Sequence, residues 1–198
     1  MVYDFIVFGA FGLQGRIVTR DLVERGYNVV LSDRIKPTQK YLQKLNNPKF
    51  IYADLRNLAG AVDVLKSANT SVVVNCAEGD FNLALQNLCL KYNSHYVDLG
   101  SDHEMTVDQF KLHDVFKKKK LCAMTGCGST PGIVNVMLRY ASKRFDAIAD
   151  VSAGFCWNSN IPVFVVPFSI QSIIEEFSEH PTVIENRAIK KVAPRSNA

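Results

Sequence analysis

A glycine-rich loop near the N-terminus constrains this chain more than any other feature of its sequence. The loop runs from Gly9 to Gly15 (GAFGLQG), and its glycines follow a G-x-x-G-x-x-G spacing. An apolar, β-rich run at Tyr3–Phe8 precedes the loop, and hydrophobic residues at helical spacing follow it over Gly12–Arg25. A glycine loop that leaves a strand and opens a helix is the context in which such a motif binds a dinucleotide.

Each glycine of the loop has its own physical role in that interpretation. Gly9 permits a sharp turn off the strand, Gly12 leaves room for a pyrophosphate against the backbone, and Gly15 lets the helix pack closely on the sheet. The free N–H groups and the dipole of the helix start then hold the anion. We therefore assign the whole loop to cofactor binding: Gly9, Ala10, Phe11, Gly12, Leu13, Gln14 and Gly15.

The choice of cofactor depends on the end of the second apolar run, NVVLSD, which closes on Asp33. A carboxylate at this place accepts hydrogen bonds from the adenosine ribose, and it repels a 2′-phosphate. Asp33 therefore favours NAD. The exposed cations expected at Arg34 and Lys36 favour NADP instead, because they offer positive charge to the 2′-phosphate. We expect NAD or NADP, with a preference for NAD.

Strand-like and helical stretches alternate along the first three quarters of the chain. Beyond the elements around the glycine loop, strand-like runs lie at 28–33, 50–53, 71–76, 95–99 and 121–125, and helical patterns at 37–45, 59–67, 82–92, 107–118 and 131–142. Such alternation predicts a parallel sheet with helices on both faces. The expected fold is α/β, a Rossmann-type doubly wound parallel sheet.

The pattern changes near Asp146, where the regular alternation of strands and helices ends. The following stretches read as a strand, an apolar run, a short helix and a last strand, at Ala149–Trp157, Ile161–Pro167, Ile170–Phe177 and Thr182–Glu185. We place a dinucleotide-binding domain at residues 1–145 and the start of a smaller mixed α/β domain, for substrate binding and dimerisation, at 146–198. About fifty residues are too few for an independent core, so we expect a fragment of a longer protein.

Other strand ends are expected to line the same crevice, because ligands bind at the carboxyl ends of strands in such sheets. The positions assigned to the cofactor in this way are Asp54, Leu55, Asn75, Cys76 and Ala77. Asp54 is expected to face the adenine, and Asn75–Ala77 the nicotinamide ribose. Asp54 and Asp80 fit helix caps equally well.

The distribution of charge argues against a nucleic-acid partner. The net charge of +4 arises entirely after Glu185, from Arg187, Lys190, Lys191 and Arg195. The body of the chain is neutral and offers no basic face to a nucleic acid.

Several further classes of protein are excluded by the cysteines, the histidines and the lengths of the apolar runs. The five cysteines form no CxxC and the four histidines no HExxH, so no metal site is predicted. Free thiols fit a reducing cytoplasm. No apolar run reaches the length of a membrane span, and the start of the chain, which carries Asp4, is unlike a signal peptide. We expect a cytoplasmic protein without a membrane partner.

Three stretches of the chain resemble the saccharopine dehydrogenase/reductase-like family. They are GAFGLQG at 9–15, FNLALQNLCLKYNSHYVDLGSD at 81–102 and GCGSTPGIVN at 126–135. The middle stretch is similar to an aromatic-Asn … Ala-Cys … Tyr-Val-Asp signature of that family. The resemblance covers essentially the whole chain, including Phe168-Ser169, although family members are usually much longer.

The resemblance implies an NAD(P)-dependent oxidoreductase that acts on a C–N bond of an amino-acid-derived small molecule, as a homodimer in the full-length protein. It also implies that Tyr96–Asp98 lies at the edge of the nicotinamide pocket. The turn Gly128–Gly132 would lie near the substrate, but it carries Thr130 where the family has an acid. The candidate reacting groups are Asp98, Cys127, Asp102 and His103, and we assign catalysis to Asp98 first and to Cys127 second.

Two other interpretations were compared with this one. A short-chain dehydrogenase shares the glycine spacing, but its chemistry needs a Tyr-x-x-x-Lys motif, which this chain lacks. A non-catalytic dinucleotide-binding or sensor protein that retains the Rossmann fold is the remaining alternative, and Thr130 in place of the acid favours it.

Overall fold

The computed structural model describes residues 2–46, 48–151, 160, 162–163, 169–186 and 188–194. The chain divides into two compact units, residues 1–153 and 154–198. The first unit contains the glycine loop and every candidate site residue. The domain boundary expected after residue 145 stays a prediction.

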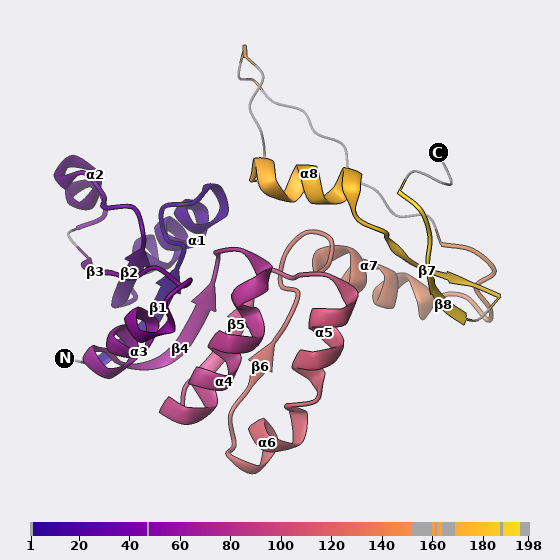
Figure 1. Ribbon diagram of the computed structural model, residues 1–198, viewed down its shortest axis with the longest axis horizontal. Helices are drawn as coiled ribbons and strands as arrows, with labels where there is room; N and C mark the ends of the chain where they lie inside the picture. The colour runs from indigo at the N-terminus through magenta and orange to yellow at the C-terminus, as the bar shows by residue number, and fades with distance from the viewer. Residues whose placement is uncertain are drawn as a thin grey trace. The chain divides into compact units, whose positions relative to one another are not determined.

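A six-stranded parallel sheet forms the centre of the first unit (Figure 1). The strands are β1 (Val2–Phe8), β2 (Val29–Asp33), β3 (Lys49–Tyr52), β4 (Asn69–Asn75), β5 (His95–Asp98) and β6 (Ala123–Met124). Their order across the sheet is β3-β2-β1-β4-β5-β6. The order therefore reverses between β1 and β4, which is the switch point where such sheets bind ligands. This arrangement confirms the predicted doubly wound, Rossmann-type α/β fold.

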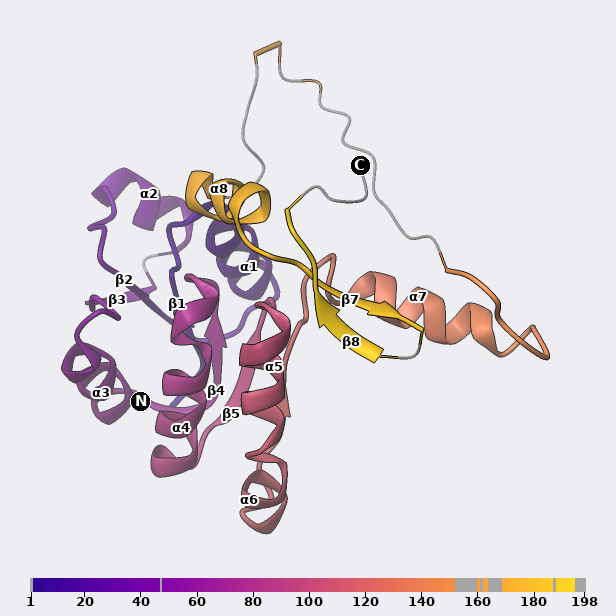
Figure 2. The same cartoon turned by 45° about the vertical axis from the view of Figure 1, so that its right-hand side comes forward.

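Helices cover both faces of this sheet, with α4 and α5 in front of it in two views (Figure 1, Figure 2). The helices of the first unit are α1 (Leu13–Glu24), α2 (Gln39–Lys44), α3 (Leu58–Ser67), α4 (Asn82–Tyr92), α5 (His103–Phe110), α6 (His113–Lys118) and α7 (Ile133–Ser142). A 3-10 turn, η1 (Gly79–Phe81), precedes α4.

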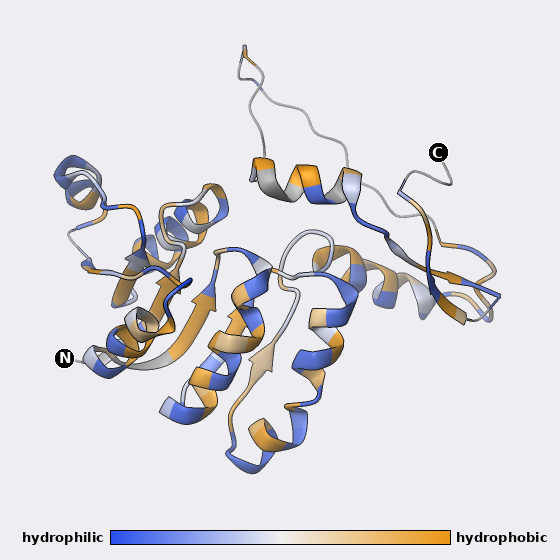
Figure 3. Cartoon of the chain, viewed as in Figure 1, coloured by the Kyte–Doolittle hydropathy of each residue, from blue (hydrophilic) through white to orange (hydrophobic). Residues whose placement is uncertain are grey.

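Alternation along the strands builds a hydrophobic core on each face. Ile6 and Phe8 of β1 belong to a buried cluster that includes residues of α3, α4 and α6. Val7, between them, belongs to the second cluster, against which residues of α1 and α2 pack. Successive side chains of a strand point to opposite faces, so a strand covered on both sides is apolar throughout. The later part of β4 is coloured hydrophobic in Figure 3, whereas its polar start is pale.

Side-chain caps move two helix starts away from their predicted positions. α2 begins after Thr38, whose hydroxyl oxygen accepts the N–H of Tyr41 at 3.2 Å, so Pro37 precedes the helix instead of standing in its first turn. The single helix predicted over 107–118 is two helices, α5 and α6. α5 starts earlier because the Asp102 carboxylate caps it, accepting the Met105 N–H at 2.8 Å.

The second unit contains a helix and a hairpin within its described part. The helix α8 (Ile170–Ser178) and the strands β7 (Thr182–Glu185) and β8 (Ala188–Lys191) form there, and the two strands pair antiparallel. The helix and the strand predicted at 170–177 and 182–185 are confirmed. The strand predicted at 149–157 and the apolar run at 161–167 lie mostly outside the described residues. Within the part of the chain described, no helix combines the length and the apolar character needed to cross a membrane.

Candidate functional site

The glycine loop is wedged between helix α1 and the loop that follows β4. Gly9 has a φ of +70°, and a Cβ there would lie 2.6 Å from the backbone N of Ala77. A Cβ on Gly15 would lie 1.9 Å from the carbonyl oxygen of Gly9. The predicted sharp turn at Gly9 is confirmed, and it needs glycine because residues that carry a side chain rarely adopt such a φ. The close contact expected for Gly15 is present, but it is made with the backbone of the loop at Gly9 and Ala10.

Gly12 is the open position of the loop. It is exposed and caps α1 with extended backbone, at φ −64° and ψ 170°, and a Cβ there would contact only the Gly9 oxygen, at 3.3 Å. The first helical hydrogen bond runs from Arg16 N–H to the Gly12 carbonyl at 3.0 Å. The N–H groups of a first helical turn have no acceptor within the helix, and Gly12 stands directly before this turn. We call this open position the Gly12 cradle, and the pyrophosphate contact expected there stays a prediction.

Phe11 anchors the loop to the core. Its ring is 5% exposed and contacts Tyr41 and Phe50, with centroids 5.7 and 5.6 Å away. Its carbonyl accepts the Nε–H of Arg16 at 2.8 Å, which holds that cation beside the start of α1. Ala10 is fully buried, whereas Leu13 and Gln14 are exposed. Sequence reasoning missed Arg16, although a cation directly after Gly15 was a usable signal.

Asp33 lies beside this anchor and not in open solvent. One carboxylate oxygen accepts the N–H of Phe11 at 2.8 Å, and the other accepts the N–H of Ile35 at 2.9 Å. The residue is only 8% exposed. Arg34 and Lys36, in contrast, are exposed. The ribose contact expected for Asp33 stays a prediction.

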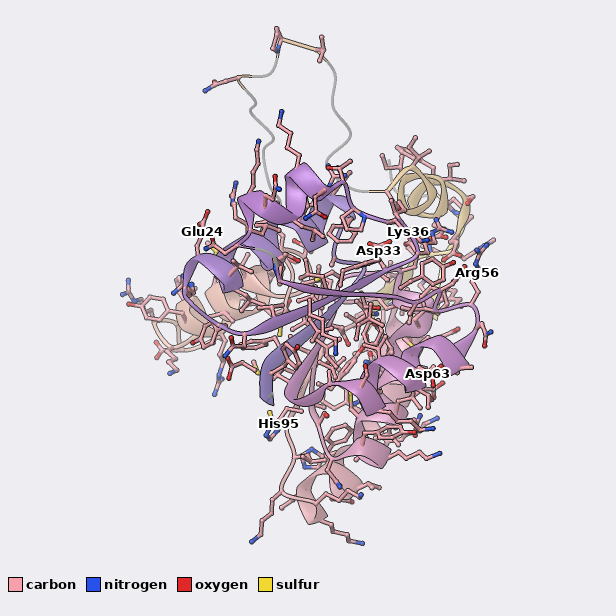
Figure 4. All side chains as sticks on the ribbon, turned by 90° about the vertical axis from the view of Figure 1, so that its left-hand side faces the viewer. Glu24, Asp33, Lys36, Arg56, Asp63 and His95 are labelled. Carbon is pink, nitrogen blue, oxygen red and sulfur yellow. The ribbon has the colours of Figure 1, made fainter. Side chains whose placement is uncertain are left out.

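The end of β3 contributes an ion pair at the same end of the sheet. Arg56 donates its Nε–H to an Asp54 oxygen at 3.0 Å. This side-chain hydrogen bond, together with the Arg56 backbone N–H, lowers the pKa of Asp54 to about 2. Figure 4 shows Asp33, Lys36 and Arg56 at one end of the strands, away from His95 at the start of β5.

Leu55 differs in environment from the neighbouring positions assigned to the cofactor. It is 7% exposed and belongs to the hydrophobic core. Its expected cofactor contact has no support in this placement and stays a prediction.

A network of buried amides shapes the loop after β4. Asn75 donates its Nδ2–H to Asn82 Oδ1 at 2.7 Å, and its own oxygen accepts the N–H of Ala77 at 3.0 Å. The Tyr96 hydroxyl donates to the same Asn82 oxygen at 3.0 Å. Burial raises the pKa of Tyr96 and raises that of the Cys76 thiol to about 12. Both groups therefore stay protonated near neutral pH, and the network acts as a support for Cys76 and Ala77 at the switch point.

Asp98 is enclosed completely by neighbouring hydrogen-bond donors. Its side chain has no exposed surface. One oxygen accepts the N–H groups of Gly100 and Gly126, at 2.9 and 2.8 Å, and the other accepts the Nε2–H of Gln109 at 2.7 Å. The carboxylate thus ties the turn after β5, the end of β6 and helix α5 together. Its assigned catalytic role stays a prediction.

The other candidate reacting groups are exposed, unlike Asp98. Cys127 is exposed, and partial burial together with the nearby Asp98 raises the pKa of its thiol, which disfavours a thiolate nucleophile. Asp102 caps α5, and His103 is the exposed first residue of that helix. Thr130 is exposed in the turn after β6.

Two of the residues that organise this region were not assigned by sequence reasoning. Asn82 lies in the Phe-Asn pair of the resemblance and had that signal. Gln109 had none, because its position on a helix says nothing of the carboxylate it meets. Among the described residues, no three His, Cys, Asp or Glu side chains gather as metal ligands.

A doubly wound sheet with a glycine loop at its switch point defines a dinucleotide-binding α/β domain. The family model for the saccharopine dehydrogenase NADP binding domain matches residues 5–124. The chain belongs to this family.

Two relatives are similar over different shares of the chain. Carboxyaminopropylagmatine dehydrogenase of Synechocystis sp. is 24% identical over 96% of this chain and 51% of its own length. The apo structure of the L-Glu-forming saccharopine dehydrogenase of Saccharomyces cerevisiae matches 71% of this chain and 31% of its own, with 16% identity and a TM-score of 0.55. The second likeness shows the fold. The chain spans about half the length of the curated relative that it matches.

Proposed function

We propose that this chain binds NADP through the glycine loop and is the nucleotide-binding part of an oxidoreductase that acts on a C–N bond of an amino-acid-derived substrate. The observation that carries the proposal is the cradle at Gly12, with open space above the first turn of α1. Membership of an NADP-binding family supports the cofactor. The name of the Synechocystis relative, a dehydrogenase of carboxyaminopropylagmatine, supports the class of reaction.

The expected preference for NAD finds no support, and we replace it with NADP. The family description names NADP. The residue on which the preference for NAD rested, Asp33, is almost buried and has both oxygens engaged with backbone N–H groups. Arg34 and Lys36 are exposed next to it. A 2′-phosphate carries negative charge and three acceptor oxygens, which these two cations are suited to bind.

The bound nicotinamide would supply or accept the hydride. The residues of the chain bind and orient the cofactor. We propose that the first turn of α1 holds the pyrophosphate, with Arg16 adding positive charge from a position fixed by the Phe11 carbonyl. Cys76 and Ala77, held by the Asn75 network, would border the nicotinamide ribose. Asp98 would fix the turn at Gly126, and the catalytic role stays assigned to Asp98 first and to Cys127 second.

A direct titration tests the cofactor proposal. Calorimetry of the chain with NADPH and NADH in parallel should give tighter binding of NADPH. The double variant Arg34→Ala/Lys36→Ala should weaken NADPH about tenfold, because charge-assisted hydrogen bonds to the phosphate are lost, and leave NADH unchanged. Lys40→Ala, which removes an exposed cation from α2, is the matched control. Equal binding of the two cofactors by the unaltered chain would contradict the proposed preference.

One observation favours a second function. Thr130 is exposed where the family carries an acid, and the Asp98 carboxylate is enclosed. A non-catalytic dinucleotide-binding or sensor protein would have this combination. Assay of the full-length protein separates the two functions: NADPH binding without turnover of any amino acid or imine would support the sensor, and turnover would exclude it.

We also propose that the full-length protein is a cytoplasmic homodimer with a small, amino-acid-like substrate. The free thiols of Cys76, Cys89, Cys122 and Cys127 support a reducing compartment. Sedimentation of the full-length protein tests the dimer.

A further inference from the structure

We propose that Asp33 is a positioning residue: its carboxylate holds the glycine loop in the form that receives a pyrophosphate, and it does not bind the adenosine ribose. The proposal rests on the proposed binding of a dinucleotide by this loop. It assigns the discrimination between cofactors to the exposed side chains that follow Asp33, and it gives the carboxylate itself a different task.

The contacts of Asp33 join three neighbouring segments. Its carboxylate accepts the N–H of Phe11 in the glycine loop and the N–H of Ile35 in the turn after β2, at 2.8 and 2.9 Å. Its backbone carbonyl accepts the N–H of Ala53 after β3, at 3.2 Å. The residue therefore ties the ends of β1, β2 and β3 to one another. At 8% exposure, little of its surface is left for a ligand.

The Phe11 N–H has no easy substitute for this acceptor. Phe11 is 5% exposed, and its ring is held by Tyr41 and Phe50. A buried N–H group without an acceptor costs folding free energy, so the loop would have to move until this group reached water. Gly12, the phosphate-facing position, follows directly in the chain. Any movement of the Phe11 peptide therefore displaces the cradle.

This role predicts a distinctive pattern of ligand affinities. Loss of the carboxylate should weaken every ligand that carries the pyrophosphate, by the same factor, because the damage lies in the loop. A carboxylate that binds the ribose would behave differently. Its loss would weaken only ligands with ribose hydroxyls, and it would strengthen ligands with a 2′-phosphate by removing a repulsion.

A thermodynamic cycle distinguishes these patterns. Calorimetry would measure ADP, 2′,3′-dideoxy-ADP and ADP with a 2′-phosphate against the unaltered chain and Asp33→Asn. Loss of a charge-assisted hydrogen bond predicts about tenfold weaker binding of all three ligands. The three factors should be equal. Asp21→Asn, which removes an exposed carboxylate that pairs with Arg25 on α1, is the charge control and should change none of them.

Two additions keep the test decisive. Asp33→Asn keeps one acceptor oxygen but loses the charge and replaces the second acceptor by an NH2 donor; Asp33→Ser, whose hydroxyl also accepts, takes its place if that variant does not fold. In the folded variant, amide hydrogen exchange should accelerate at Phe11 and stay slow at Ala10, whose N–H donates to the Ser32 carbonyl at 3.2 Å. A loss confined to ADP, or a gain for the 2′-phosphorylated ligand, would overturn the positioning role. Failure of the unaltered chain to bind ADP would instead overturn the proposed cofactor site.

Discussion

Replacement of Gly15 by alanine tests the close contact on which the glycine loop depends. The new Cβ would lie 1.9 Å from the Gly9 carbonyl oxygen, 2.8 Å from the Gly9 carbonyl carbon and 3.0 Å from the Ala10 Cα. All three atoms belong to the backbone, so no flexible side chain can move aside. Gly9 cannot retreat freely either, because the space beside it is filled: a Cβ added there would lie 2.6 Å from the Ala77 backbone N.

The cost follows from two opposing contributions. Forcing a methyl group against packed atoms costs about 1–3 kcal/mol, and a backbone contact as close as this one belongs at the upper end. Alanine within a helix gains about 1 kcal/mol over glycine. The net expectation is a loss of about 2 kcal/mol of folding free energy, which lowers the Tm by about 4–8 °C for a chain of this size.

Thermal and urea unfolding, followed by circular dichroism, measure this effect. Gly12→Ala is the matched control, since its Cβ meets only one atom, at 3.3 Å, and its φ of −64° suits alanine. The control should unfold close to the unaltered chain. If Gly15→Ala has the same unfolding midpoint as the unaltered chain, or if both variants lose the same stability, the packing argument for the loop is wrong.

Three further predictions concern groups around the sheet ends. Asp98→Asn should lower the free energy of unfolding by about 2 kcal/mol, because enclosed charge-assisted hydrogen bonds are lost; an unchanged urea midpoint would contradict this. Asp54 should titrate near pH 2 by NMR, and nearer 3.8 in Arg56→Ala. Since its pKa is lowered on folding, the ion pair stabilises the fold above about pH 4, and the gain is lost as the pH falls toward 2. At pH 8, iodoacetamide should alkylate exposed Cys122 well before Cys76, whose pKa is raised to about 12 by burial; equal rates would refute that burial.

Most of the sheet could be predicted from local patterns. Helix α4 has the predicted bounds, and the strands of the sheet lie within two residues of their expected positions, apart from the shorter β6. The central strands β1, β2 and β4 contain apolar runs covered on both faces, and such runs are a local property of the sequence. The early start of α5 was missed because the Asp102 cap sets it through one side-chain hydrogen bond.

The sharp turn at Gly9 and the need for a glycine at position 15 were also predictable. A position with positive φ, or one without room for a Cβ, requires glycine, so both kinds of position can be recognised in a sequence. Asp33 and Asp98 show the opposite case. Both were recognised as carboxylates at strand ends, yet most of the hydrogen-bond donors that fix their roles come from other segments of the chain.

The sequence by itself determined the alternation of strands and helices, and with it the doubly wound sheet and the place of its glycine loop. Only the tertiary structure decided what the carboxylates at the strand ends do. Each carboxylate has one local donor, two residues further along the chain, but its other donors are distant in sequence: Phe11 for Asp33, and Gly126 and Gln109 for Asp98. Burial and hydrogen-bond geometry arise when separate segments meet, so no local pattern specifies them.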